Sequence, residues 1–513
     1  MKRNIKEALK IILFLLCVFF LVLIISKLTL RKTSREKMTL FFERAEDLDV
    51  IFAGISHTQS GVYPLELWEN YGITSYNLAS AGMRMQTNYW NLLNALSFSS
   101  PKLIVLDTDY MDYEVSDGPK LSELTRENFD AYPLSRIKLE TAADLIDDPR
   151  EKAGFLFPLI RYHSRWKELT MRDFGALEIN VDNGAAHDPI EEMGVSEPEI
   201  PPLLPESEMT DCGEISVEYL EKIISLCKER GIDLLLVYPP APVGEEKQRL
   251  ANAVKPIADE AGVDYLNFLH IDCGVDYDVD MKDLNGHLNE AGARKYTSYL
   301  GKYIKEHYDI PDHRNDTGAG ETSLSPGRLA IWNDALSAYP TYKAGRIVKQ
   351  PYLDIYCSML SDDDFNPVIF FPEDSPILKD QRFQRLLKNI VPDEEKDVFD
   401  GIGEKALSEN GYLFIADRES TPRLKLVPLP SSGEEELSLS FGTVLFGRDE
   451  NGRPDLRFPG ENENRLGDGL DSNSNPWGAA TFVFDARTKE LVHNGFFTVL
   501  EPEKPGPINA MKY

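Results

Sequence analysis

The sequence lacks the residue patterns that mark metal-binding, redox and nucleotide-binding proteins. Its 513 residues include five cysteines, none in a CxxC pair, which leaves zinc ribbons and thioredoxin-type motifs unsupported. Neither a GxxxxGK[ST] phosphate loop nor a GxGxxG dinucleotide motif occurs. The stretch Asp468–Asn475 resembles a calcium loop in composition, but without the EF-hand glycine and terminal glutamate it reads better as a solvated loop. We therefore predict no metal and no cofactor.

Basic residues are also in short supply. The chain has 55 Lys and Arg against 85 Asp and Glu, a formal net charge of −30. Such a charge repels phosphate backbones, so nucleic acid is not an expected partner. It also repels an anionic membrane surface or polymer unless cations intervene.

Long apolar runs are absent except for one at the amino terminus. Ile11 to Ile25 is unbroken and follows Lys2, Arg3, Lys6 and Lys10. We predict an uncleaved membrane anchor over residues 1–36, in contact with membrane lipid. The alternative is a cleaved signal peptide, although 26–30 makes a poor cleavage site. A single-pass protein of the cell membrane, with its main domains extracytoplasmic, is the expected arrangement.

Strands and helices alternate after the anchor, a pattern typical of an α/β fold. Short apolar runs predict five strands, at Val50–Ala53, Thr74–Leu78, Leu103–Leu106, Asp233–Tyr238 and Val263–Phe268, of which the first ends at Gly54 and the fourth at Pro239. Between and after them, helices are predicted at Pro64–Tyr71, Gln86–Phe98, Val217–Arg230, Glu245–Ala261 and Glu290–Tyr308. We expect a three-layer α/β/α domain with a parallel sheet over residues 37–312.

Two segments interrupt or follow this pattern. Residues 110–211 break the alternation and are predicted to form an insertion or lid over the carboxyl edge of the sheet. Residues 313–330 are predicted to be a linker, and 331–513 a separate α+β domain. Its expected helix is Gln381–Val391, and its expected strands are Pro367–Phe371, Tyr412–Ala416, Leu424–Pro428, Leu437–Phe446, Thr481–Asp485 and Glu490–Val499.

The candidate nucleophile is Ser56, which follows the first strand and Gly54. An unassisted hydroxyl is a poor nucleophile and needs a base. The best candidate base is His287, and Asp283 could fix its tautomer, with Asp280 as the fallback carboxylate. For a single serine after a strand, a helix cap is the simpler interpretation.

Other polar groups are predicted at the same edge. Gly82, after the second strand, could offer its N–H to an oxyanion, although a turn glycine is the simpler interpretation. After the third strand, Thr108 or Asp107 occupies a similar place. His57 either contacts substrate or fills the turn. His163 and Trp166 either line a cleft or belong to an amphipathic helix packed on the sheet.

The order of these blocks resembles the SGNH/GDSL hydrolase superfamily, over roughly Leu48 to Tyr308. The runs Gly54–His57 and His287–Thr297 look especially like its membrane-anchored bacterial branch, which is similar to the SGNH-like domains of polysaccharide O-acetyltransferases. The resemblance implies Ser56 as nucleophile, His287 as base, Asp283 as its orienting carboxylate, and an oxyanion hole at Gly82 and the Ser56 N–H. Three features depart from the family pattern: no aspartate precedes the serine, the asparagine block is missing, and Asp283 lies four residues before His287 instead of three.

Two functions follow as alternatives. The first is a serine acyl-ester hydrolase or O-acyltransferase, most simply for acetyl groups on cell-envelope polysaccharide, which as a transferase would need a membrane partner to supply acyl groups. The second is a non-catalytic surface protein that keeps the SGNH fold to bind glycan or protein.

Overall fold

In a computed structural model, the chain forms two compact units. The first comprises Met1–Ala186, Pro201–Cys273 and Thr297–Ala335, and the second His187–Ile200, Gly274–Tyr296 and Leu336–Tyr513. The structure describes residues 2–112, 114, 121, 124–170, 173, 182–186, 200–283, 285–318, 320, 323–350, 353–372, 381–396, 411–459, 464–465, 478–499 and 510–512.

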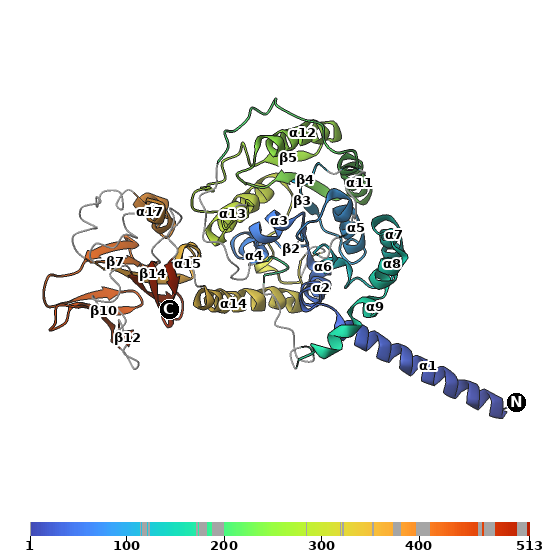
Figure 1. The fold of residues 1–513 in the computed structure, drawn as a ribbon, viewed down its shortest axis with the longest axis horizontal. Coiled ribbons are helices and arrows are strands. Elements are labelled where there is room, and N and C mark those ends of the chain that lie inside the picture. Colours follow the sequence, from blue (N-terminus) through green and yellow to red (C-terminus); the bar gives the residue numbers. More distant parts are fainter. Residues whose placement is uncertain are drawn as a thin grey trace. The chain divides into compact units, whose positions relative to one another are not determined.

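A five-stranded sheet with only parallel neighbours forms the centre of the first unit (Figure 1). The strands are β1 (Val50–Ala53), β2 (Ser75–Asn77), β3 (Leu103–Asp107), β4 (Asp233–Tyr238) and β5 (Asp264–Asn267), in the order β2-β1-β3-β4-β5. All of β1 and β3 is buried, as expected for central strands of a parallel sheet. The strand order reverses between β1 and β3, so a ligand site is expected beyond their carboxyl ends.

Helices cover both faces of this sheet. They are α3 (Ser56–Gly61), α4 (Pro64–Tyr71), α5 (Met85–Ala95), α11 (Glu214–Arg230), α12 (Glu245–Ala261) and α13 (Glu290–His307). Figure 1 shows α4 and α13 on one side of the sheet and α5 and α11 on the other. A Cβ on Gly301 of α13 would lie 2.4 Å from the Tyr71 ring, so the missing side chain lets α13 approach α4 closely.

The α/β alternation predicted from the sequence is confirmed. The bounds of β1, β4, α4 and α12 agree with the prediction, and the other predicted strands and helices of this region shift by a few residues at their ends. Such shifts are expected, because the hydrophobic pattern locates an element while local hydrogen bonds and caps decide where it ends.

Several helices were not predicted. Helix α2 (Lys32–Arg44) is rich in basic residues, yet Arg35, Lys37 and Arg44 are buried. Helix α14 (Pro326–Lys349) begins inside the predicted linker. The insertion contains three further unpredicted helices, α6 (Arg126–Phe129), α7 (Arg136–Leu145) and α8 (Pro149–Leu156). Where a helix around His163 and Trp166 was predicted, it contains α9 (Pro158–Tyr162) and the 3-10 helix η3 (His163–Lys167).

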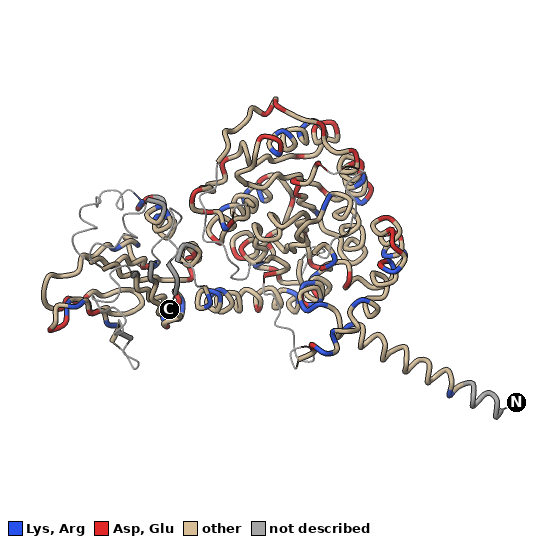
Figure 2. The backbone as a smooth tube through the Cα atoms, viewed as in Figure 1, with Lys and Arg blue, Asp and Glu red and all other residues tan. Residues whose placement is uncertain are grey.

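Helix α1 (Lys2–Thr29) is long and apolar enough to cross a membrane over Leu9–Thr29, 21 residues. Among the described residues it is the one helix with this property. Figure 2 shows that the described part of this helix is almost free of charged residues. Its large apolar side chains are exposed all round, which is unusual for a helix in water.

The second unit is α+β. It contains α15 (Leu353–Met359), α17 (Gln381–Lys388) and two antiparallel sheets, with the orders β15-β14-β13-β6-β7-β8 and β12-β11-β10-β9. The strands are β6 (Phe365–Phe371), β7 (Tyr412–Ala416), β8 (Leu424–Pro428), β9 (Glu434–Leu439), β10 (Gly442–Arg448), β11 (Pro454–Phe458), β12 (Asn464–Arg465), β13 (Gly478–Asp485), β14 (Leu491–Val499) and β15 (Ala510–Lys512).

The larger of these sheets has apolar side chains on both faces. Val368 and Phe370 of β6 join a core with Val444 and Phe446 of the smaller sheet. Ile369 and other alternate residues join a second core with α15 and α17. This alternation follows from the two-residue period of a strand.

The predicted strand Leu437–Phe446 is wrong as a single element. It is a hairpin, in which β9 and β10 pair antiparallel across a turn at 440–441. A second difference concerns the segment Gly274–Tyr296, which was predicted within the α/β domain but groups with the carboxy-terminal unit. Val279 lies in the core beside α15 and α17, which explains this grouping.

Candidate active site

Ser56 is the first residue of α3, directly beyond the buried strand β1. The junction needs Gly54, which has φ +152°, and a Cβ there would lie 2.3 Å from the Asp107 Cβ. The β1 backbone therefore passes close against the end of β3 at the point where the strand order reverses. Ser56 is half-buried and lies beyond the carboxyl end of β1.

A buried carboxyl group lies beside this junction. Asp107 accepts hydrogen bonds from Thr58 Oγ1 at 2.9 Å and from the Asp109 N–H at 2.9 Å. Burial and the neighbouring charge of Asp109 raise the pKa of Asp107 to about 6. The Asp107 carboxyl therefore takes up a proton in a range where an ordinary aspartate stays ionised.

His57 pairs with a carboxylate in the first unit. Its Nδ1 lies 3.3 Å from Asp109 Oδ2, and the same carboxylate accepts from Tyr238 Oη at 2.8 Å and Lys247 Nζ at 3.0 Å. Burial alone would raise the pKa of Asp109, but His57 and Lys247 outweigh burial and lower the pKa well below its usual range. Substrate contact and a turn residue both stay predictions for His57.

The turn after β2 carries Gly82, whose φ of +71° suits a glycine. Asn77, which the sequence analysis did not select, ties this region to α3. Its Nδ2 donates to Thr58 O at 2.8 Å and Val62 O at 3.0 Å, and its Oδ1 accepts from Ala79 N at 3.2 Å. The sequence signal that could have identified Asn77 was an asparagine at the end of a predicted strand. An amide group that is buried there must find hydrogen-bond partners.

Thr108 does not present its donors to an oxyanion in this structure. Both its N–H and its hydroxyl donate to Val237 O of β4, at 2.9 and 3.1 Å. An oxyanion role for Thr108 would require these bonds to break. Asp107 was the alternative to Thr108 at the end of the third strand. Its carboxyl group already accepts hydrogen bonds from Thr58 and from the Asp109 N–H.

The predicted base and its carboxylate lie together in the second unit. His287 Nδ1 is 2.7 Å from Asp283 Oδ2. Burial would raise the pKa of Asp283, but the hydrogen bond and charge of His287 outweigh it and lower the pKa. Asp280, the fallback, is bonded elsewhere, to Lys295 Nζ at 2.6 Å and Asn389 Nδ2 at 3.0 Å.

Ser56 and the Asp283–His287 pair belong to different units. The structure thus brings together Ser56, His57 and the end of β3 in one unit, and Asp283 with His287 in the other. The pairing of Ser56 with His287, and the catalytic roles of these residues and Gly82, stay predictions.

The helices of the predicted insertion pack on other helices. Helix α7 contacts α5, α6 contacts α2, and α9 and η3 contact α1. Residues 182–186 do reach the sheet edge, where Asn183 O accepts from Asn77 N and Ala186 N donates to Gln59 O. His163 and Trp166 are exposed on η3, so the predicted amphipathic helix packed on the sheet is not what these residues form.

No group of three or more His, Cys, Asp or Glu that could hold a metal ion occurs among the described residues. The candidate loop Asp468–Asn475 lies outside the described residues.

Comparison with known proteins adds little to this geometry. No family model and no curated protein matches the sequence. Among solved structures, the chain is similar to a Bacteroides fragilis protein described as a candidate acylhydrolase, with 12% identity and a TM-score of 0.27, covering 53% of this chain and 95% of that one. A similarity at this level carries no information about what this chain does.

Proposed function

We propose that this chain is a membrane-anchored, serine-dependent acyl-ester hydrolase or O-acyltransferase that acts outside the cytoplasm on cell-envelope polysaccharide. The observation that carries the proposal is the position of Ser56, half-buried beyond β1 at the reversal point of a parallel sheet. The Asp283–His287 pair supplies the second requirement, an imidazole whose Nδ1 proton is held by a carboxylate.

In the proposed reaction, Ser56 Oγ attacks the carbonyl carbon of an acyl ester while His287 Nε2 takes the hydroxyl proton. The tetrahedral oxyanion is bound by the N–H groups of Ser56 and Gly82. Collapse expels the alcohol, which takes the proton from His287 and leaves an acyl-serine. Water or a sugar hydroxyl then attacks the acyl-serine, which gives hydrolysis or transfer. The meeting of Ser56 with His287 rests on the sequence resemblance.

The membrane and polysaccharide parts of the proposal have separate supports. Helix α1 is long and apolar enough to span a bilayer. Polysaccharide as the acceptor, acetyl as the acyl group and a membrane partner as acyl donor come from the resemblance to the anchored bacterial branch.

Fluorophosphonate labelling of the full chain in detergent tests the serine mechanism. We expect one labelled residue, Ser56, and loss of labelling in Ser56→Ala. His287→Ala should slow labelling about a hundredfold or more, the usual contribution of a general base. Ser97→Ala is the matched control, because Ser97 is an exposed serine bonded only locally, to Leu93 O.

His57→Gln separates the two His–Asp pairs. If His57 with Asp109 were the activating pair, His57→Gln would abolish labelling and His287→Ala would not. That result would overturn the proposed role of His287 and keep that of Ser56.

A non-catalytic binding protein is the second candidate. It is favoured by Thr108, whose donors are both used within the sheet, and by the acidic groups Asp107 and Asp109 near the place where an oxyanion would form. A folded chain that shows no labelling at Ser56 would support this function, and glycan pull-down would then be the next measurement.

A further inference from the structure

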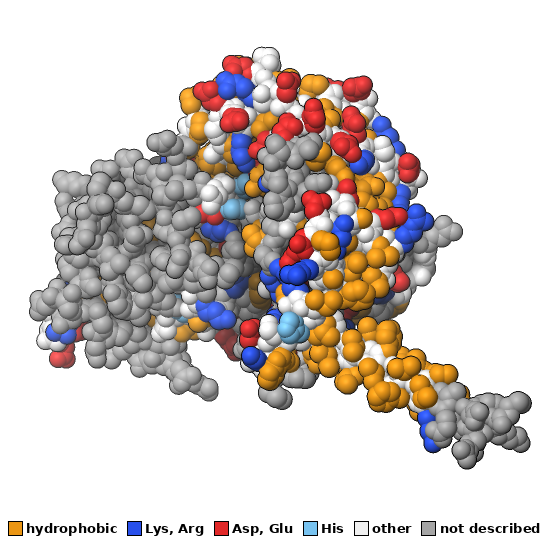
Figure 3. Space-filling model, turned by 45° about the vertical axis from the view of Figure 1, so that its right-hand side comes forward, with side chains coloured by type: hydrophobic (Ala, Val, Ile, Leu, Met, Phe, Trp, Pro, Cys, Tyr) orange, Lys and Arg blue, Asp and Glu red, His pale blue; other side chains and the backbone are white. Residues whose placement is uncertain are grey.

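A group of exposed apolar side chains lies beside the carboxyl end of α1. It comprises Leu134, Phe157, Ile160 and Trp166, each between 53 and 65% exposed, and we call it the collar. Figure 3 shows the orange surface of α1 continuing onto the adjoining face of the first unit. Apolar side chains gathered so closely mark a surface that is covered by something apolar.

The collar is fixed to α1. Helix α9 and η3 pack against α1, and Arg165 of η3 donates to Thr29 O at 3.0 Å and to Leu30 O. The Arg31 guanidinium also lies over the Tyr162 ring, 5.7 Å from its centre. The collar therefore sits at the depth at which α1 leaves the membrane, where Trp and Arg side chains are favoured.

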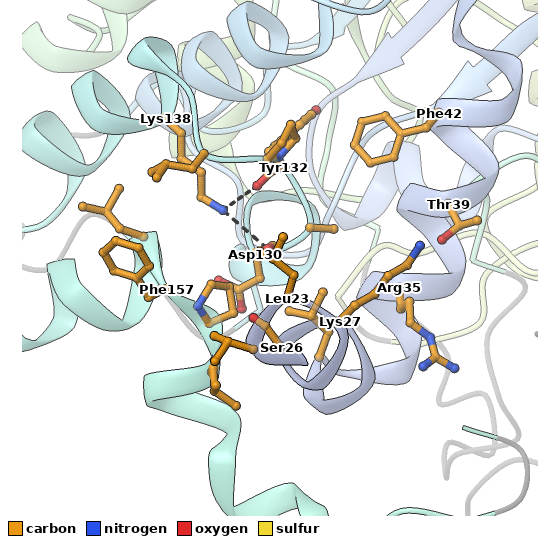
Figure 4. Close-up of a pocket in the computed structure, with 18 of the residues that line it drawn as sticks. Leu23, Ser26, Lys27, Arg35, Thr39, Phe42, Asp130, Tyr132, Lys138 and Phe157 are labelled. Carbon is orange, nitrogen blue, oxygen red and sulfur yellow. Dashed lines mark hydrogen bonds between the residues drawn. The ribbon is translucent and has the colours of Figure 1, made fainter. Parts of the chain in front are cut away.

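A cavity of about 560 Å³ opens between the collar and α1 (Figure 4). Phe19, Val22 and Leu23 of α1 form one wall, and Phe42, Tyr132 and Phe157 are among the residues of the others. Ten residues separate Phe19 from Thr29, the last residue of the span, which is about 15 Å along a helix. This is about half of a bilayer's hydrocarbon thickness of about 30 Å, so one wall of the cavity reaches to mid-membrane depth.

The cavity is also lined by basic side chains, among them Lys138, which has hydrogen-bond partners inside the chain. Lys138 Nζ donates to Tyr132 O at 2.7 Å and Asp130 O at 3.4 Å, as Figure 4 shows. Lys27 and Arg35 are the other basic residues in the lining. One carboxyl group, Asp130, also lines the cavity and accepts a hydrogen bond from Tyr162 Oη. The result is an apolar slot with three basic residues against one acidic residue, which suits a chain that bears a phosphate.

We propose that this cavity holds an acyl chain of a glycerophospholipid from the membrane that α1 enters. The first unit would then be seated on the bilayer through the collar, and not merely tethered to it by α1. The proposal rests on α1 being membrane-embedded, which is part of the proposed function. It is independent of Ser56 and of any catalysis.

Photocrosslinking in nanodiscs tests the proposal. The full chain is reconstituted with a phosphatidylglycerol that carries a diazirine near the middle of one acyl chain, and the labelled peptides are mapped by mass spectrometry. We expect labelling at 131–138 and 156–159 as well as on α1. Ala131→Trp, which fills the cavity, should lower collar labelling about tenfold, as removal of roughly two buried methylene groups would.

Two variants keep the result decisive. Thr39→Phe fills the same cavity from α2, so collar labelling should fall even if Ala131→Trp does not fold. Leu203→Trp, an exposed position outside the cavity, is the control and should leave labelling unchanged. Labelling of α1 alone, or collar labelling unaffected by both filling variants, would overturn the proposal. Absence of labelling on α1 as well would overturn the membrane anchor itself.

Discussion

Asp107 gives the candidate site a measurable pH dependence. Its pKa is about 6 in the folded chain and near 3.8 when unfolded, so the folded chain binds its proton more tightly. This group therefore contributes stability below about pH 4 that is lost as pH rises through about 6. The difference of about two pKa units corresponds to about 3 kcal/mol.

Asp107→Asn should remove this dependence. The amide oxygen can still accept from the Asp109 N–H, and the amide nitrogen can donate to the Thr58 hydroxyl in place of the hydrogen bond that Asp107 Oδ2 accepts. We expect the free energy of unfolding of the wild type, relative to Asp107→Asn, to fall by about 2 kcal/mol between pH 4 and pH 7. Urea denaturation at several pH values measures it, and parallel curves for the two proteins would contradict the raised pKa.

Asn77 is a residue whose importance only the structure reveals. Asn77→Asp replaces an amide donor with a carboxylate facing the carbonyl oxygens of Thr58 and Val62. We expect a loss of about 2–4 kcal/mol of stability, because a buried charge is left opposed and unpaired. Since α3 carries Ser56, fluorophosphonate labelling should also slow. Equal stability and equal labelling would show that α3 is held by other contacts.

At the scale of elements, α14 is a helix that the sequence analysis did not predict, and its first residues, 326–330, lie in the predicted linker. Its composition is a mixture of apolar and polar residues, but Trp332 is fully buried. The Trp332 ring lies 5.4 Å from the Trp68 ring of α4, and the Arg44 guanidinium lies 4.9 Å from the centre of the Trp332 ring. Packing of one large side chain thus fixes a helix whose sequence pattern is weak.

Trp332→Ala should therefore destabilise the first unit. We expect a loss of about 3–5 kcal/mol, the usual cost of truncating a buried tryptophan. Trp166→Ala is the matched control, since Trp166 is 65% exposed and its loss should change stability in detergent far less. Thermal unfolding measures both, and a similar small effect for the two would contradict the packing of α14.

At the scale of the whole molecule, the candidate base depends on the carboxy-terminal unit. The segment that carries Asp283 and His287 is held there by Val279 in the core, by Asn389 on Asp280, and by Arg294 on Asp362 at 2.9 Å. A residue far from His287 in the sequence should therefore affect catalysis.

Asn389→Ala is the corresponding test. We expect fluorophosphonate labelling of Ser56 to slow severalfold while the thermal midpoint changes little, because the loop loses one of its fixing contacts. Asn70→Ala, whose amide bonds only to Glu66 O on an exposed surface, is the control. Unchanged labelling would mean that the position of His287 is set without Asn389, or that His287 is not the base.

The apolar span, the order of the α/β elements, and the position of Ser56 after β1 could all be predicted from the sequence. These follow from hydrophobic periodicity and from glycine and proline at element ends, which act over a few residues. Three features became visible with the three-dimensional structure: the His287 segment joins the second unit, α14 is a helix, and a cavity lies beside α1. Each depends on contacts between residues far apart in the chain, such as Val279 with the α15–α17 core, Trp68 with Trp332, and Arg165 with Thr29, which no local pattern encodes.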